Sequence, residues 1–214
     1  MVNESKRWME TSDVIQTFPT LVWKLQIDAG LHDATAARLP TALTDRRRGP
    51  PPLEPGRGWQ SGQALHQRAD FRELVSFVDR GITSSLRFLR IGRDAFETTA
   101  CWARVLAKGA AHKVHCHRNN FLIGVYYVRT QPGADTVNFD DPRRQTSVVR
   151  PPVVELTADN TVQVVVKVHD ATLLMFPSFL EHSVDANTSK EDRSGISFNV
   201  MFYSFTQQLS KPLW

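Results

Sequence analysis

The second half of the chain consists of short segments of strand-forming residues. Five segments beyond residue 97 are rich in β-branched and aromatic residues, and Gly, Pro, Asp and Asn separate them. A series of short strands with turn residues between them favours a β-sandwich or barrel over alternating strand–helix–strand units. The predicted strands cover residues 98–106, 121–128, 161–168, 172–176 and 196–205.

The first 97 residues predict elements that precede and cover this sheet structure. Residues 18–27 predict an entry strand, and a short helix is expected over 34–43. Residues 45–58 contain four prolines and three glycines, which indicates a loop, either a solvated connection or a lid over a site. Apolar residues at helical spacing from Phe71 to Leu89 predict a covering helix, with Asp70 and Glu73 as a capping box.

Length and composition indicate one globular domain, 1–214, with an N-terminal part (1–97) and a β core (98–206). No apolar run reaches the roughly 20 residues of a membrane span, and the N-terminus lacks a secretory signal, so we expect a cytoplasmic protein. Two cysteines do not suggest a disulfide scaffold. The net charge of +4 could suit nucleic acid, but the arginine cluster at 46–48 has no interleaved aromatics, which disfavours that partner.

Three histidines are the candidate metal ligands. His115 and His117 are two residues apart, so on an extended strand both imidazoles point to the same side. His112 has the opposite parity and is expected to lie outside the ligand set. His182 follows an apolar strand and a turn proline, and it supplies a third ligand. Three protein ligands on one face suit a catalytic iron(II) ion, although the same set could hold zinc.

The strand that begins near Arg193 supplies polar groups to the same side as the metal. Arg193, Ser197 and Asn199 share one face of this strand, and alternating apolar residues share the other. A guanidinium group binds carboxylates in a bidentate manner, so Arg193 suits a dicarboxylate cosubstrate such as 2-oxoglutarate. Tyr126 and Tyr127 are further candidates for orienting cosubstrate or substrate, or else are core aromatics.

The chain resembles a known family of 2-oxoglutarate–Fe(II) oxygenases, whose runs are H-x-H, SGVYYV, D-P-R, FPSWLEHSV and RISISFN. This sequence has HCH, IGVYYV, DPR, FPSFLEHSV and RSGISFN at 115–117, 123–128, 141–143, 176–184 and 193–199. The resemblance implies a double-stranded β-helix (jelly roll, cupin-like) in which His115, His117 and His182 match the metal positions and Arg193 the oxoglutarate-carboxylate position. His117 stands where the commoner oxygenase triad has a carboxylate.

We therefore expect an Fe(II)/2-oxoglutarate-dependent dioxygenase that oxidises, and most simply hydroxylates, a small-molecule substrate with O2, releasing succinate and CO2. Arg193, Ser197, Asn199 and Tyr127 are the predicted cosubstrate-binding residues. A second copy of the chain is a candidate partner in a homodimer. The alternatives are a three-histidine dioxygenase or hydrolase that does not use 2-oxoglutarate, and a non-catalytic β-helix binding module.

Overall fold

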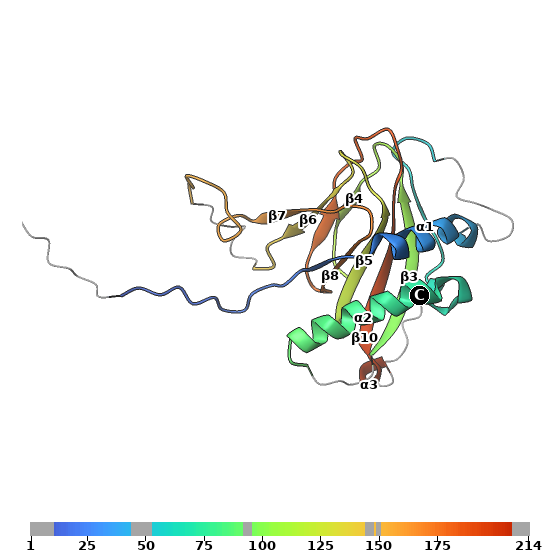
Figure 1. Cartoon of the computed structure of the whole chain (residues 1–214). Helices are drawn as coiled ribbons and strands as arrows, with labels where there is room; N and C mark the ends of the chain where they lie inside the picture. The colour runs from blue at the N-terminus through green and yellow to red at the C-terminus, as the bar shows by residue number, and fades with distance from the viewer. Residues whose placement is uncertain (1–10, 44–52, 92–95, 144–147, 149–150, 207–214) are drawn as a thin grey trace, which may run out of the picture.

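Two antiparallel sheets form the core of the protein (Figure 1). The computed structural model describes residues 11–43, 53–91, 96–143, 148 and 151–206. The larger sheet contains β1 (Trp23–Gln26), β8 (Thr172–Pro177), β5 (Leu122–Arg129), β10 (Arg193–Phe202), β3 (Phe96–Leu106) and β2 (Gly58–Gln60), in that order. The smaller sheet has the order β4 (His112–His115), β9 (His182–Val184), β6 (Thr136–Asp140) and β7 (Gln163–Lys167).

The larger sheet has a different core on each of its faces. One face packs against helix α2 (Arg72–Phe88). The other packs against the smaller sheet, through Tyr127, Leu174 and Phe176 on the larger sheet and Val137 and Phe139 on β6. Successive residues of a strand point to opposite faces, so each central strand contributes to both cores. This two-sheet, mainly β arrangement is the predicted double-stranded β-helix, or jelly roll, and the prediction is confirmed.

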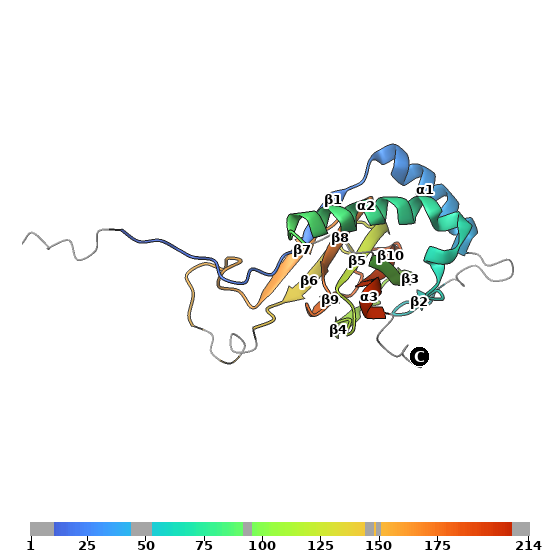
Figure 2. The ribbon, with the colours of Figure 1, turned by 90° about the horizontal axis from the view of Figure 1, so that it is seen from below.

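The covering helices lie on the outer face of the larger sheet (Figure 2). In α2 the apolar stripe is buried as predicted, and Ile82 at its centre is fully buried. Gly81 allows α2 to approach strand β8 closely, because a Cβ at this position would lie 3.0 Å from Leu173 Cδ2. The predicted capping box is wrong: the helix begins after Phe71 without a side-chain cap, and Asp70 instead pairs with Arg68.

Helix α1 (Ala29–Leu43) starts five residues before the predicted 34–43. The Asp28 carboxylate accepts hydrogen bonds from the amides of Gly30 and Leu31, at 2.9 and 3.2 Å, and so caps the first turn. This capping residue lies outside the predicted range, so the prediction placed the start of the helix too late. Two 3-10 turns, η1 (Leu65–Gln67) and η2 (Ala69–Phe71), precede α2, and a short helix α3 (Tyr203–Thr206) follows β10.

The proline-rich loop predicted over 45–58 lies partly outside the described residues, which resume at residue 53. Its described end runs along the turn after β3, where the Gly56 amide donates to Lys108 O at 2.7 Å. Its interpretation as a lid stays a prediction. None of the helices in the described part of the chain has the length and apolar character needed to cross a membrane.

Candidate metal centre and active site

The three predicted ligand histidines lie together at one end of the smaller sheet. His115 ends β4 and is the cross-strand partner of His182, the first residue of β9. Their ring centroids are 4.2 Å apart, and the His117 ring lies 5.1 Å from His115 and 5.5 Å from His182. One possible ligand atom from each of the three lies within 4.8 Å of the others. The structure therefore brings all three residues together.

Each of these histidines uses Nδ1 to bond to the protein. Nδ1 of His115 donates to Lys113 O at 2.9 Å, and Nδ1 of His182 donates to Leu180 O at 3.0 Å. Nδ1 of His117 donates to the side-chain oxygen of Asn199 at 2.9 Å. Because the acceptors are oxygens, the neutral rings carry their proton on Nδ1, and the lone pair on Nε2 is available for a metal.

Burial keeps these imidazoles neutral. Desolvation lowers the pKa of His115 and His117 and lowers that of His182 to about 4. Trp102 stacks on His117 with ring centroids 5.8 Å apart and an interplanar angle of 14°, which shields one face of that imidazole from water. A neutral imidazole with a fixed tautomer is the form that binds a divalent metal.

We expect the metal-free protein to lose stability as the pH falls below about 6.5, the ordinary histidine value. Burial lowers the folded-state pKa of His182 to about 4 and that of His112 to about 3. Between these values and about 6.5 the unfolded chain binds more protons than the folded chain, so stability is present above this window and decreases within it. Urea unfolding of metal-free protein at pH 7 and pH 5 checks this; an equal or higher midpoint at pH 5 would contradict it.

Arg193 starts β10 and is buried, with 5% of its surface exposed. Its Nη1 donates to Thr136 O at 2.8 Å, and its guanidinium carbon lies 5.0 Å from the centre of the Tyr127 ring. No carboxylate in the described part of the chain forms an ion pair with it. A buried cation without an anion is costly, so the arrangement suits an anionic ligand.

A cavity that is partly open to solvent joins the histidines to Arg193. Tyr127 and Ser197 line it, as predicted for cosubstrate-binding residues. Asn199 is instead hydrogen-bonded to His117, so it holds a ligand ring, and its direct contact with a cosubstrate stays a prediction. Tyr126 points to the opposite face, where its hydroxyl bonds His32 Nδ1 at 2.6 Å, so it is a core aromatic.

The sequence prediction missed three residues that line this cavity: His112, Trp102 and Arg104. By strand alternation His112 is predicted to point away from His115. A register shift in β4 between these two residues removes the alternation, and their ring centroids lie 4.0 Å apart. Trp102 and Arg104 alternate along β3, which pairs with β10 in the same sheet. Their alternation places both on one face of β3, but only the β3–β10 register shows that this face is shared with Arg193 and Ser197.

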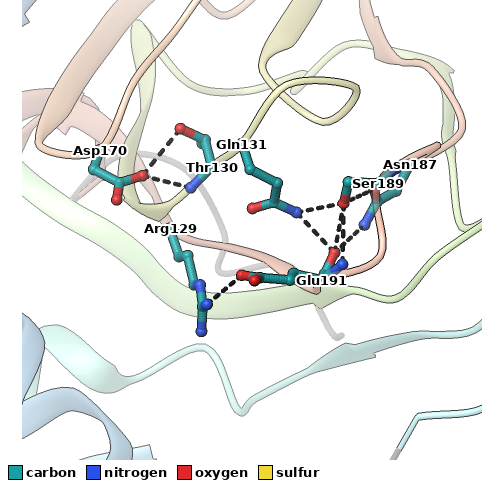
Figure 3. Close-up of polar contacts among 7 residues, drawn as sticks. All are labelled: Arg129, Thr130, Gln131, Asp170, Asn187, Ser189 and Glu191. Carbon is teal, nitrogen blue, oxygen red and sulfur yellow. Dashed lines mark hydrogen bonds and ion pairs between the residues drawn. The ribbon is translucent and has the colours of Figure 1, made fainter.

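A hydrogen-bonded turn lies among the ten residues between His182 and Arg193 (Figure 3). The buried Asn187 side chain donates to Leu106 O on β3 at 3.1 Å and to Glu191 O at 2.8 Å. Gln131, just after β5, donates to Ser189 Oγ and to Glu191 O. The turn is thereby tied to β3 and to the end of β5 in the larger sheet, which holds Arg193 at a set position relative to His182.

Replacing Asn187 with alanine is expected to destabilise the fold by about 1–3 kcal/mol, because it removes the side-chain hydrogen bonds that this buried amide makes to Leu106 O, to Glu191 O and to Ser189. Differential scanning calorimetry would measure the loss. Asn160→Ala, in an exposed turn, is the control and should change stability by less than about 0.5 kcal/mol. Equal effects of the two substitutions would show that Asn187 does not hold this turn.

Comparison with solved structures shows the same fold in oxygenases. HygX from Streptomyces hygroscopicus, with nickel and 2-oxoglutarate bound, superposes with a TM-score of 0.61 at 12% identity, covering 86% of this chain and 83% of HygX. The α-ketoglutarate-dependent carbocyclase SnoK from nogalamycin biosynthesis gives 0.63 at 15% identity, with 89% and 87% covered. A Pseudomonas putida prolyl-4-hydroxylase gives 0.59 at 15% identity, with 86% and 93% covered. A sequence search of curated proteins finds no match.

The family match and the solved structures of the same fold point to the class of 2-oxoglutarate–Fe(II)-dependent oxygenases. Residues 100–199 match the model of the family described as "Putative 2OG-Fe(II) oxygenase". The matched segment includes His115, His117, His182 and Arg193.

Proposed function

We propose that the protein is an oxygenase in which His115, His117 and His182 bind one iron(II) ion and Arg193 binds the distal carboxylate of 2-oxoglutarate. The observation that carries the proposal is that one cavity contains three Nδ1-anchored histidines and a buried guanidinium that forms no ion pair with any described residue. Three ligands on one side of a metal leave positions for cosubstrate and oxygen. HygX, of the same fold, has been crystallised with nickel and 2-oxoglutarate.

The side chains of this site have separate tasks in the proposed reaction. Lys113 O, Leu180 O and Asn199 fix the ligand rings, so the metal site is organised before the ion arrives. Tyr127 and Thr136 O hold the Arg193 guanidinium, which orients the cosubstrate. Apolar residues such as Val137 and Phe176 limit water in the cavity. The bound iron and cosubstrate supply the oxidative chemistry.

The proposed reaction is oxidation, most simply hydroxylation, of a small-molecule substrate with release of succinate and CO2. Solved structures of the same fold bind different compounds: one HygX structure has hygromycin B bound, and a prolyl hydroxylase from Trichoplax adhaerens is in complex with a peptide fragment. The fold therefore leaves the substrate of this chain open.

The proposal is tested by incubating purified protein with iron(II), 2-oxoglutarate and O2 and measuring succinate. We expect succinate release that depends on both iron and oxygen, and that decreases strongly with His182→Ala. Metal binding without 2-oxoglutarate binding would favour the three-histidine dioxygenase or hydrolase. Absence of metal binding would favour a non-catalytic β-helix module.

The homodimer remains a prediction, and β7 is the surface that would suit it. This strand is the outer edge of the smaller sheet and exposes 40% of Val164 and 56% of Val165. An exposed apolar edge can pair with another strand. In a two-fold antiparallel pair centred on Val165, Gln163 of one copy would oppose Lys167 of the other, so like charges would not meet. Light scattering would measure the mass in solution.

A further inference from the structure

The side chains that line the active-site cavity carry an excess of positive charge. Among the described residues that line it, the charged ones are Arg104 and Arg193, and none is Asp or Glu. Its three metal ligands are neutral imidazoles, so they leave the full charge of a divalent metal uncompensated. In the proposed function, 2-oxoglutarate supplies two negative charges, one carboxylate at the metal and the other at Arg193. Arg104 then has no counter-ion.

Arg104 lies in the middle of the cavity wall formed by β3, opposite Gly195 of β10. Its guanidinium donates one hydrogen bond, from Nη2 to the side-chain oxygen of Gln60 at 2.8 Å. No carboxylate in the described ranges forms an ion pair with it. The side chain is half-buried, and burial lowers its pKa. A partly desolvated guanidinium with free donors is suited to bind an oxyanion.

The two arginines act on different parts of the cavity. Arg104 is two residues from Trp102 on the same face of β3, and Trp102 stacks on His117, so Arg104 lies next to the histidine side of the cavity. The Arg193 guanidinium packs over the Tyr127 ring. Gln60, which holds Arg104, is an exposed residue of the edge strand β2, so this side of the cavity is near the protein surface.

We propose that Arg104 binds an oxyanion group, a carboxylate or a phosphate, on the substrate that is oxidised. This inference rests on the proposed function, in which Arg193 binds the distal carboxylate of 2-oxoglutarate and Arg104 is left for the substrate. The anionic group of the substrate sits at Arg104 beside the histidines, which places the neighbouring carbon atoms next to the metal. The substrate class is thus a small organic acid or phosphate ester, and its oxidised carbon lies within a few bonds of the anion.

The experiment uses the anaerobic complex of the protein with iron(II) and saturating 2-oxoglutarate. The complex is titrated with sodium acetate or with sodium phosphate, and its visible charge-transfer absorption is measured. The two salts distinguish a carboxylate site from a phosphate site. Acetamide is the neutral probe, and sodium chloride controls for ionic strength. The variants are Arg104→Gln and, as a control with the same loss of charge on an exposed side chain near the end of β3, Lys108→Gln. Calorimetry measures 2-oxoglutarate binding by each variant and by Arg193→Gln.

We expect acetate or phosphate to change the absorption, whereas acetamide and chloride do not. Arg104→Gln should raise the half-saturating anion concentration at least about tenfold, as expected for one charge-assisted contact, and Lys108→Gln should leave it unchanged. Arg104→Gln should keep 2-oxoglutarate affinity within about threefold, in contrast to Arg193→Gln, because the contact it removes belongs to the substrate.

Three results would overturn the inference: no anion response in the unaltered protein, an anion response that survives Arg104→Gln, or a loss of 2-oxoglutarate affinity in Arg104→Gln as large as in Arg193→Gln. The last result would assign Arg104 to the cosubstrate. Failure of the unaltered protein to bind 2-oxoglutarate at all would instead refute the proposed function, so the two failures are distinguishable. Circular dichroism of each variant shows that it is folded.

Discussion

Replacing His182 with alanine is expected to abolish stoichiometric iron(II) binding. His182 is buried, 6% exposed, and its Nδ1 is fixed by Leu180 O, so its Nε2 contributes a preorganised ligand. Removing one of three protein ligands leaves two, and even the loss of a residue that supports a ligand typically costs 10–100-fold in metal affinity. We therefore expect a loss of more than about 100-fold, measured by calorimetry with iron(II) under anaerobic conditions and by metal analysis after desalting.

The control is His169→Ala, which removes an exposed imidazole at the turn before β8 and should keep full metal content. His182→Gln preserves most of the volume in the core beside Phe176 and separates ligand loss from a packing defect. His115→Ala should have the same effect as His182→Ala, because the two rings are cross-strand partners. Retention of one metal per chain in either alanine variant would show that the three histidines are not the metal site.

Much of the fold could be predicted because its central strands have strong local patterns. The expected segments 98–106, 121–128 and 172–176 correspond closely to β3, β5 and β8. In β10 the apolar residues Ile196, Phe198 and Val200 pack under α2 as predicted, although the strand begins at Arg193 and ends at Phe202. Because the sheet buries these residues, they are apolar, and their alternation with more polar residues is visible in the sequence.

The smaller sheet was harder to predict. β4, β6 and β9 have only four, five and three residues, and much of their stabilisation comes from pairing with strands distant in the sequence. Local propensity is weak over so few residues, and tertiary context decides. The prediction for His115 and His117 assumed a continuous strand, whereas β4 ends at His115 and His117 is held by the hydrogen bond from its amide to Ser178 O. The two imidazoles still converge.

The candidate site was predictable where it depended on residue type and not where it depended on long-range contacts. Three histidines and one arginine suffice to suggest a metal and a carboxylate. The role of Asn187 follows from a hydrogen bond to Leu106, 81 residues away in the chain. The place of His112 follows from a bulge in β4. No local pattern marks either feature.

Replacing Arg193 with glutamine is expected to weaken 2-oxoglutarate binding by about 100-fold or more, because two charge-assisted hydrogen bonds contribute about 3 kcal/mol or more. Arg193→Lys keeps the charge but not the bidentate fork, so it should retain intermediate affinity. Calorimetry on metal-loaded protein measures both. Arg129→Gln is the control, since it removes an exposed arginine of β5 that pairs with Glu191 away from the cavity.

The same substitution should have the opposite effect on the ligand-free protein. Arg193 is buried against Tyr127 and Thr136 O without a carboxylate among the described residues, so its charge is only partly compensated until an anion binds. Replacing a poorly compensated buried charge by a neutral side chain is often neutral or stabilising. We expect the thermal midpoint of ligand-free Arg193→Gln to equal or exceed that of the unaltered protein, while the increase that 2-oxoglutarate causes is lost. A large destabilisation of the ligand-free variant, with the ligand-induced increase retained, would make Arg193 a structural residue and not the site of the cosubstrate.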